Sequence, residues 1–201
     1  MKNTRFSNYR QLLRFKKPIL NPKQRRLSRA HTIYDLRKIA KRVTPQGPFD
    51  YTDGAADQEI SLNRARRAFE DIEFHPHILR NVDKASLATT LLGKPVNLPV
   101  GIAPTGFTRM MNSAGERVSS SVAQELGIPF ALSTMGTTSI ENVAKAAPHG
   151  SNWFQLYLWR DREKSMELIS RAHLAGFDGL ILTVDAQIAG ARLRDVRNGL
   201  T

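Results

Sequence analysis

The chain has 201 residues, with 30 Lys or Arg, 18 Asp or Glu and no Cys, and its formal net charge is +12. This length is enough for one domain with a sizeable core, and the lack of Cys excludes disulfides, thiolate metal sites and a cysteine nucleophile. No run approaches the roughly 18 apolar residues of a membrane-spanning helix, and no apolar signal-peptide core is evident. A cytoplasmic location is therefore the natural expectation, although a chain without Cys also suits an oxidising compartment.

Positive charge is concentrated near the N-terminus. Residues 1–42 hold 14 of the Lys and Arg residues and a single acid, Asp35, so the rest of the chain is close to neutral. A neutral main domain argues against a nucleic-acid-binding face. We therefore divide the chain into a basic arm, residues 1–29, and a domain, residues 30–201.

The basic arm leaves three interpretations open. It is a solvated tail, or a segment resembling an organelle transit peptide, or a peripheral contact with the inner face of a membrane. The last interpretation rests on apolar side chains such as Phe6 and Leu12, which alternate with the cations of the arm.

Helical periodicity begins after Thr32, which with Asp35 has the spacing of a capping box and predicts a helix to Val43. The segment 44–48 contains two prolines and a glycine and predicts a break. A second helix is expected from Asp57 to Phe69. Residues 72–98 read as irregular structure with short strands.

A repeated strand–helix unit follows. Apolar runs that predict strands begin near residues 98, 128, 152 and 179, and helical patterns lie between them. Such alternation predicts an α/β fold with a parallel sheet and right-handed crossovers.

The expected helices of this repeat carry recognisable end signals. Ser113 and Glu116 have capping-box spacing, and Gly127 is a stop signal. Ser139 and Asp161 are the expected N-caps of the next two helices.

Polar residues close the third and fourth apolar runs. They are Gln155, Tyr157, Thr183 and Asp185. Because parallel strands end at one edge of a sheet, such residues are typical of a binding site there. Two arginines, Arg192 and Arg194, follow in a Gly-containing loop, and together these groups suit a phosphate-bearing cofactor and a carboxylate substrate. The alternatives are that the polar groups satisfy loop backbone and that the arginines form surface ion pairs.

Six segments carry a resemblance to a known family. They are FDYTDGAADQE (49–59), FHPHILRNVD (74–83), GIAPTGF (101–107), LST (132–134), WFQLY (153–157) and LTVDAQIAGARLRDVRNG (182–199). In order and content they resemble the FMN-dependent α-hydroxy-acid dehydrogenases and oxidases, and most closely the cytochrome- or quinone-linked L-lactate dehydrogenases. The resemblance implies the N-terminal half of a (β/α)8 TIM barrel, about four βα units, preceded by N-terminal helices.

The resemblance also implies roles for individual residues. Six would contact FMN: Pro104, Thr105 and Gly106 through their backbone, and Ser133, Gln155 and Thr183 at the polar edge of the flavin. Three would contact the substrate: Tyr51, Tyr157 and Arg192. Asp185 would orient a catalytic histidine, and no metal is implied. One departure from the family pattern is Ala55, at a position where Gly is usual.

The resemblance implies a hydroxy-acid oxidoreductase that transfers electrons from a small L-2-hydroxy acid, foremost L-lactate, to FMN and then to a quinone, a cytochrome or oxygen. Full-length relatives are expected to be homo-oligomers. No histidine of the chain stands in the family's NHGGR context, so we expect a truncated chain that is inactive alone. The alternative is a non-catalytic half-barrel that assembles with a partner half or a binding protein.

A half-barrel should leave the inner faces of its strands uncovered. The apolar residues expected to be exposed there are Val100, Ile102, Leu132, Phe154, Leu156, Leu180 and Leu182.

Overall fold

The computed structural model describes residues 18–185 and 188–199. The expectation for the basic arm therefore falls outside the described residues over positions 1–17. The chain divides into two compact units, and the division falls between Phe49 and Asp50. No helix of the described segments has the length and apolar character needed to cross a bilayer.

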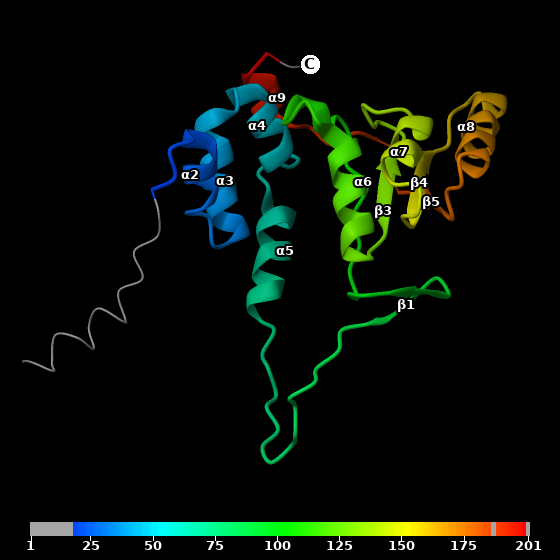
Figure 1. The fold of residues 1–201 in the computed structure, drawn as a ribbon. Helices are drawn as coiled ribbons and strands as arrows, with labels where there is room; N and C mark the ends of the chain where they lie inside the picture. The colour runs from blue at the N-terminus through cyan, green and yellow to red at the C-terminus, as the bar shows by residue number, and fades with distance from the viewer. Residues whose placement is uncertain (1–17, 186–187, 200–201) are drawn as a thin grey trace, which may run out of the picture. The chain divides into compact units, whose positions relative to one another are not determined.

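The first unit contains helix α2 (Pro22–Leu27), helix α3 (Ile33–Val43) and the start of helix α4 (Gln46–Asp53) (Figure 1). The predicted capping box of α3 is confirmed, since Asp35 N–H donates to Thr32 Oγ1 and Thr32 N–H donates to Asp35 Oδ2, both at 3.1 Å. The predicted break is shorter than residues 44–48, because α4 accepts Pro48 in its first turn, where a helix needs no N–H donor.

The second unit begins with the end of α4, followed by helix α5 (Ile60–Glu70) and an antiparallel hairpin of strands β1 (Thr89–Leu91) and β2 (Lys94–Val96). The two turn residues, Leu92 and Gly93, both have positive φ, at 48° and 78°. That pair of values matches the tight turn that the twist of a two-stranded ribbon favours. The predicted irregular segment with short strands is confirmed.

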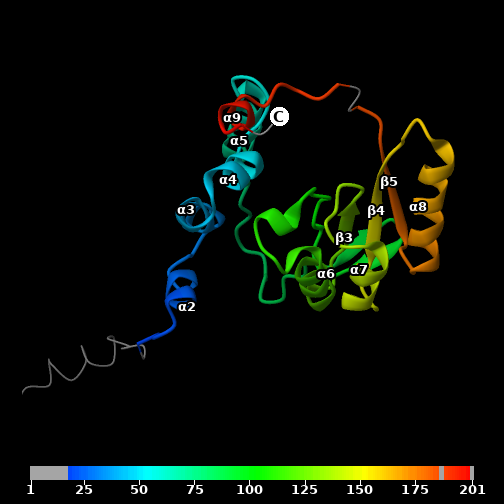
Figure 2. The same ribbon diagram turned by 90° about the horizontal axis from the view of Figure 1, so that it is seen from above.

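A three-stranded parallel sheet forms the centre of the second unit. Its order is β3 (Phe130–Ser133), β4 (Asn152–Tyr157) and β5 (Gly179–Thr183). Helices α6 (Gly115–Leu126), α7 (Ile140–Ala146) and α8 (Arg162–Leu174) lie along this sheet, and α9 (Leu193–Arg197) follows it (Figure 2). The parallel β/α alternation of the predicted half-barrel is confirmed.

The first predicted strand is reduced to one bridge. Ile102 pairs with Phe130, donating its N–H to Pro129 O at 2.8 Å and accepting from Ala131 N–H at 2.9 Å. Gly101 lies directly before this bridge and Pro104 two residues after it, and both residue types weaken a strand. The first of the four predicted strands is thus present in position but not in length.

The core lies between the sheet and helices α6–α8. It gathers strand residues with the inward faces of the helices and comprises Ala123, Ile128, Phe130, Leu132, Ile140, Val143, Phe154, Leu156, Ala172 and Phe177. The expected exposure of Leu132, Phe154 and Leu156 is therefore wrong, because these side chains face the helices and are at most 2% exposed.

Leu180 and Leu182 are exposed, at 50% and 49%, but not on the inner face that the half-barrel was expected to leave uncovered. In the register of β4 and β5 they lie beside Phe154 and Leu156, on the helix-facing side. Val100 is also exposed, whereas Ile102 is partly buried against the core.

Most of the helix-end residues predicted from the sequence are found at the helix ends of the structure. Ser139 Oγ and Asp161 Oδ1 accept from the Asn142 and Lys164 N–H groups, as predicted. Gly127 ends α6 with φ of 65°. The capping box of Ser113 is wrong, since α6 begins at Gly115 without a side-chain cap.

Candidate functional site

Three predicted residues form one hydrogen-bonded row near the C-terminal ends of the strands. Ser133 Oγ donates to Gln155 Oε1 at 3.1 Å, and Gln155 Nε2 donates to Thr183 Oγ1 at 2.7 Å. Gln155 lies between Phe154 and Leu156, which face the helices, so its own side chain points to the opposite face. The structure thus brings Ser133, Gln155 and Thr183 together, as the sequence predicted.

The loop after β3 orients the amide of Gln155. Thr134 N–H donates to Gln155 Oε1 at 3.2 Å, and Thr134 Oγ1 donates to Gln155 O at 2.6 Å. Because Oε1 receives donors from both Ser133 and Thr134, Nε2 is directed toward Thr183. Thr134 was not among the predicted site residues, although it closes the matched LST segment.

The predicted backbone segment 104–106 approaches the same loop. Phe107 N–H donates to Met135 O at 3.0 Å, and a Cβ placed on Gly106 would lie 3.0 Å from Met135 Cβ. Tyr51 borders this segment: its hydroxyl is 3.9 Å from that Cβ position, and its ring meets Phe107 edge-on at 5.8 Å. Tyr51 therefore lies next to Gly106 at the edge of the sheet.

A buried carboxylate anchors the loop that follows β3. Glu116 is 1% exposed, and its oxygens accept from Thr137 N–H at 2.6 Å and from the Thr138 hydroxyl at 2.7 Å. Burial alone would raise its pKa, but hydrogen bonding to Thr108, Thr137 and Thr138 lowers the pKa to about 2. Glu116 is thus charged at neutral pH and holds the loop through residues 21 and 22 positions away.

A cavity of about 220 Å³ opens beside this carboxylate. It is lined by residues 102, 103, 105–108 and 111 of one loop, together with Thr52, Glu116, Ser119 and Phe130. The cavity lies on the loop that carries Gly106, so the buried charge of Glu116 borders the candidate site directly.

The loop after β5 reaches the same region through Arg192. Its Nε donates to Asp195 Oδ2 at 2.6 Å, its NH2 group donates to the backbone carbonyl of Tyr51, and its guanidinium lies 4.7 Å from the centre of the Tyr51 ring. The side chain keeps 35% of its area exposed. Asp195, which sequence reasoning missed, therefore fixes Arg192 over Tyr51.

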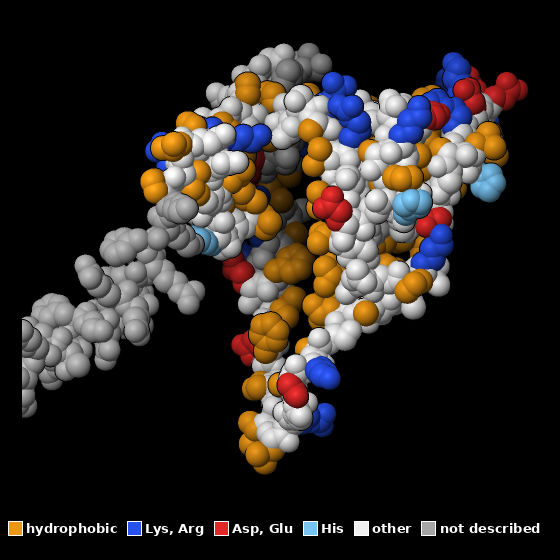
Figure 3. Space-filling model, viewed as in Figure 1, with side chains coloured by type: hydrophobic (Ala, Val, Ile, Leu, Met, Phe, Trp, Pro, Cys, Tyr) orange, Lys and Arg blue, Asp and Glu red, His pale blue; other side chains and the backbone are white. Residues whose placement is uncertain are grey.

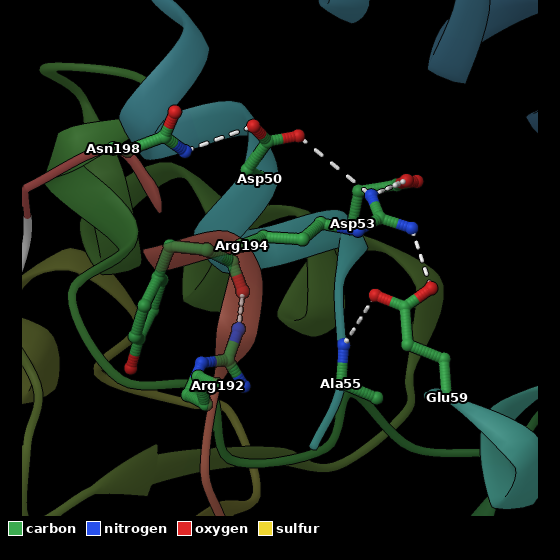
Figure 4. Close-up of polar contacts among 8 residues, drawn as sticks. Asp50, Asp53, Ala55, Glu59, Arg192, Arg194 and Asn198 are labelled. Carbon is green, nitrogen blue, oxygen red and sulfur yellow. Dashed lines mark hydrogen bonds and ion pairs between the residues drawn. The ribbon is translucent and has the colours of Figure 1, made fainter. Parts of the chain in front are cut away.

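Arg194 forms an ion-pair network (Figure 4). Its guanidinium contacts Asp53 at 3.0 Å, Glu59 at 2.5 Å and Asp50 at 3.7 Å. The hydrogen bond from Arg194 is the main cause of a lowered pKa at Glu59. The ion-pair alternative thus holds for Arg194, whose partners lie more than 130 positions away, and also for Arg192, which pairs with Asp195.

The segment around Ala55 is tied to this network. Ala55 N–H donates to Glu59 Oε1 at 3.2 Å, and Asp57 N–H donates to Ala191 O at 2.7 Å. Positive φ falls on Asp57 and Glu59, not on Ala55. The departure from the family's glycine therefore introduces no strain at Ala55.

Two predicted residues are less enclosed. Tyr157 ends β4 with 37% of its area exposed, and Asp185 lies in an exposed bend after β5. Within residues 18–185 and 188–199, no three His, Asp or Glu side chains are grouped as metal ligands would be.

Comparisons with known proteins agree with this arrangement. A family model described as FMN-dependent dehydrogenase matches residues 40–201. A Mycobacterium tuberculosis protein named "Putative L-lactate dehydrogenase" is 54% identical over 190 residues, covering 94% of this chain and 46% of that protein. Human 2-Hydroxyacid oxidase 1 is 37% identical over 172 residues, covering 86% of this chain and 46% of that protein. A crystal structure of mandelate oxidase superposes with a TM-score of 0.81 at 33% identity, covering 86% of this chain and 50% of the other. The chain thus spans about half the length of the curated relatives that it matches.

Proposed function

Because the chain belongs to the FMN-dependent dehydrogenase family, we propose that its strand-end residues form the flavin- and substrate-facing part of an enzyme that oxidises an L-2-hydroxy acid, foremost L-lactate to pyruvate. The observation that carries this proposal is the row Ser133–Gln155–Thr183 beside the backbone of Gly106. The names of the relatives, an L-lactate dehydrogenase and a 2-hydroxyacid oxidase, support the substrate class.

The residues present fit FMN. Gly106 has no side chain, and a Cβ there would lie 3.0 Å from Met135 Cβ, so its backbone packs closely on the loop after β3. From that position the backbone of Pro104, Thr105 and Gly106 would contact the flavin ring. Gln155, Ser133 and Thr183 provide the amide and hydroxyl groups that hydrogen-bond the polar edge of such a ring. When bound, the flavin supplies the two-electron redox chemistry that no side chain of the chain can perform.

The substrate would be held by Tyr51, Tyr157 and Arg192. A guanidinium fork held by Asp195 is suited to a carboxylate, and two phenol groups can hydrogen-bond the carboxylate and hydroxyl of a 2-hydroxy acid. Asp185 would orient and charge-stabilise a catalytic histidine, which the matched segments do not contain. The electrons would pass on to a quinone, a cytochrome or oxygen.

A flavin titration tests this assignment. FMN added to the chain should show quenched fluorescence on binding, and Thr183→Val should weaken binding several-fold, because it removes the hydroxyl that accepts from Gln155 with little change of shape. Thr90→Val, an exposed change in β1, is the matched control. Equal affinity of both variants would contradict the role of Thr183.

A turnover assay tests the second half of the proposal. Oxidation of a 2-hydroxy acid needs a base within hydrogen-bond reach of the hydroxyl proton. We expect the 201-residue chain with FMN, L-lactate and a dye acceptor to turn over no faster than free FMN. Faster turnover would show that these residues contain the base.

A second candidate function is a half-barrel that assembles with a partner half. The half-exposed side chains of Leu180 and Leu182 favour it, since a strand with this apolar face is suited to association. A lactate-dependent activity that appears only when a separately expressed second half is mixed in would support this candidate.

A further inference from the structure

A cavity of about 330 Å³ lies between helices α2 and α3, in the first unit of the chain. It is lined by Arg26, Arg29, Asp35, Lys38, Ile39, Arg42 and Val43. The four cations come from two directions, because Arg26 and Arg29 lie at the end of α2 whereas Lys38 and Arg42 share one face of α3. None of these cations belongs to the proposed flavin or substrate site.

The one acid in this cavity does not balance the four cations. Residues 18–49 contain eight Lys or Arg and no acid except Asp35. The carboxylate of Asp35 already accepts from His31 N–H, Thr32 N–H and the Thr32 hydroxyl, as the lowered pKa of Asp35 reflects. The cavity therefore keeps a clear excess of positive charge.

Placing these cations close together causes electrostatic repulsion when no anion lies among them. Lys38 and Arg42 stand at i and i+4 on one helix, a spacing at which like charges repel each other. An anion placed among them would relieve that repulsion, and guanidinium forks with a lysine are the usual partners of phosphate oxygens.

Apolar side chains border the charged cavity. Ile39 and Val43 line it, and Val43 is 52% exposed; Tyr34, whose ring centre lies 4.5 Å from Lys38 Nζ, is 58% exposed. Figure 3 shows hydrophobic and basic side chains intermixed over α2 and α3. A surface that combines exposed apolar groups with cations matches the boundary between lipid headgroups and acyl chains.

We propose that the α2–α3 cavity binds the phosphate of an anionic phospholipid headgroup, with Val43 and Tyr34 entering the adjacent acyl boundary. The exposed apolar side chains favour lipid over a free phosphate compound, which would leave them without a role. The cavity lies within residues 26–43 and shares no residue with the proposed flavin and substrate site.

Vesicle sedimentation with the full chain tests the proposal. The cavity variant is Arg26→Gln, Arg29→Gln, Arg42→Gln. The control variant is Lys23→Gln, Arg25→Gln, Lys41→Gln, which removes the same charge from the same helices outside the cavity. At low salt, each basic residue near an anionic surface contributes about fivefold in affinity, so the cavity variant should bind phosphatidylglycerol vesicles about a hundredfold more weakly. The control should lose less than tenfold.

Further measurements distinguish a lipid phosphate from a free phosphate compound and from diffuse charge. Wild-type chain should not sediment with neutral phosphatidylcholine vesicles, and millimolar glycerol phosphate should not release it from acidic ones. Equal losses in the two variants would overturn the cavity, because diffuse charge would then explain binding. Release by glycerol phosphate, or binding of that compound without vesicle binding, would overturn the lipid as the source of phosphate. Circular dichroism must show the same helix content in all three proteins.

Discussion

Replacing Glu116 with Gln tests whether a buried charge holds the loop beside the candidate site. The carboxylate is 1% exposed and is surrounded by donors, among them Thr137 N–H at 2.6 Å and the Thr138 hydroxyl at 2.7 Å. Gln keeps one accepting oxygen but places an amide group where the second oxygen accepts. Since hydrogen bonds to charged groups are stronger than those to neutral ones, the variant should be less stable.

The expected loss of stability in this variant follows from the lowered pKa of Glu116. Lowering it from 4.5 to about 2 corresponds to about 3 kcal/mol in favour of the charged folded state. Because the folded pKa is below the unfolded value, this stability is present above pH 4.5 and is lost as the pH falls toward 2. The wild type should therefore exceed Glu116→Gln by about 3 kcal/mol at pH 7 and by roughly 1 kcal/mol at pH 3.

Urea denaturation followed by tryptophan fluorescence measures this difference. Glu125→Gln is the control, because it makes the same chemical change at an exposed position of the same helix and should change stability by less than about 0.5 kcal/mol. The reasoning would be refuted by a difference below about 1 kcal/mol at pH 7, or by one that does not shrink on acidification.

Two further changes test the packing and the ion-pair network. Gly179→Ala should destabilise the sheet by about 1–3 kcal/mol in urea denaturation, because the added Cβ would lie 2.5 Å from Trp153 Cδ1; an unchanged midpoint would show that the indole moves away freely. Arg194→Gln removes the partner of Asp53 and Glu59 and should speed amide exchange around Ala55, whereas Arg197→Gln, at an exposed position of the same helix, should not; equal exchange in both variants would contradict the network's role.

The sequence determined the features that depend on neighbouring residues. The bounds of β4 and the caps at Thr32, Ser139 and Asp161 were predictable, because each involves groups only a few positions apart. The family and its FMN dependence were also predictable, since the matching segments keep their order along the chain.

Only the tertiary structure decided where distant groups meet. Ser113 and Glu116 have the spacing of a cap, yet Thr137 and Thr138 outcompete that local bond for the carboxylate. The sequence likewise contains no signal for the pairing of Arg194 with Asp53 and Glu59.

The faces of the strands were the other feature beyond the sequence. Leu132, Phe154 and Leu156 sit in strands that are buried along most of their length, so apolar residues do not mark one side. Helices α6–α8 decide which side they occupy, because burying these side chains against the helices removes the most apolar surface from water.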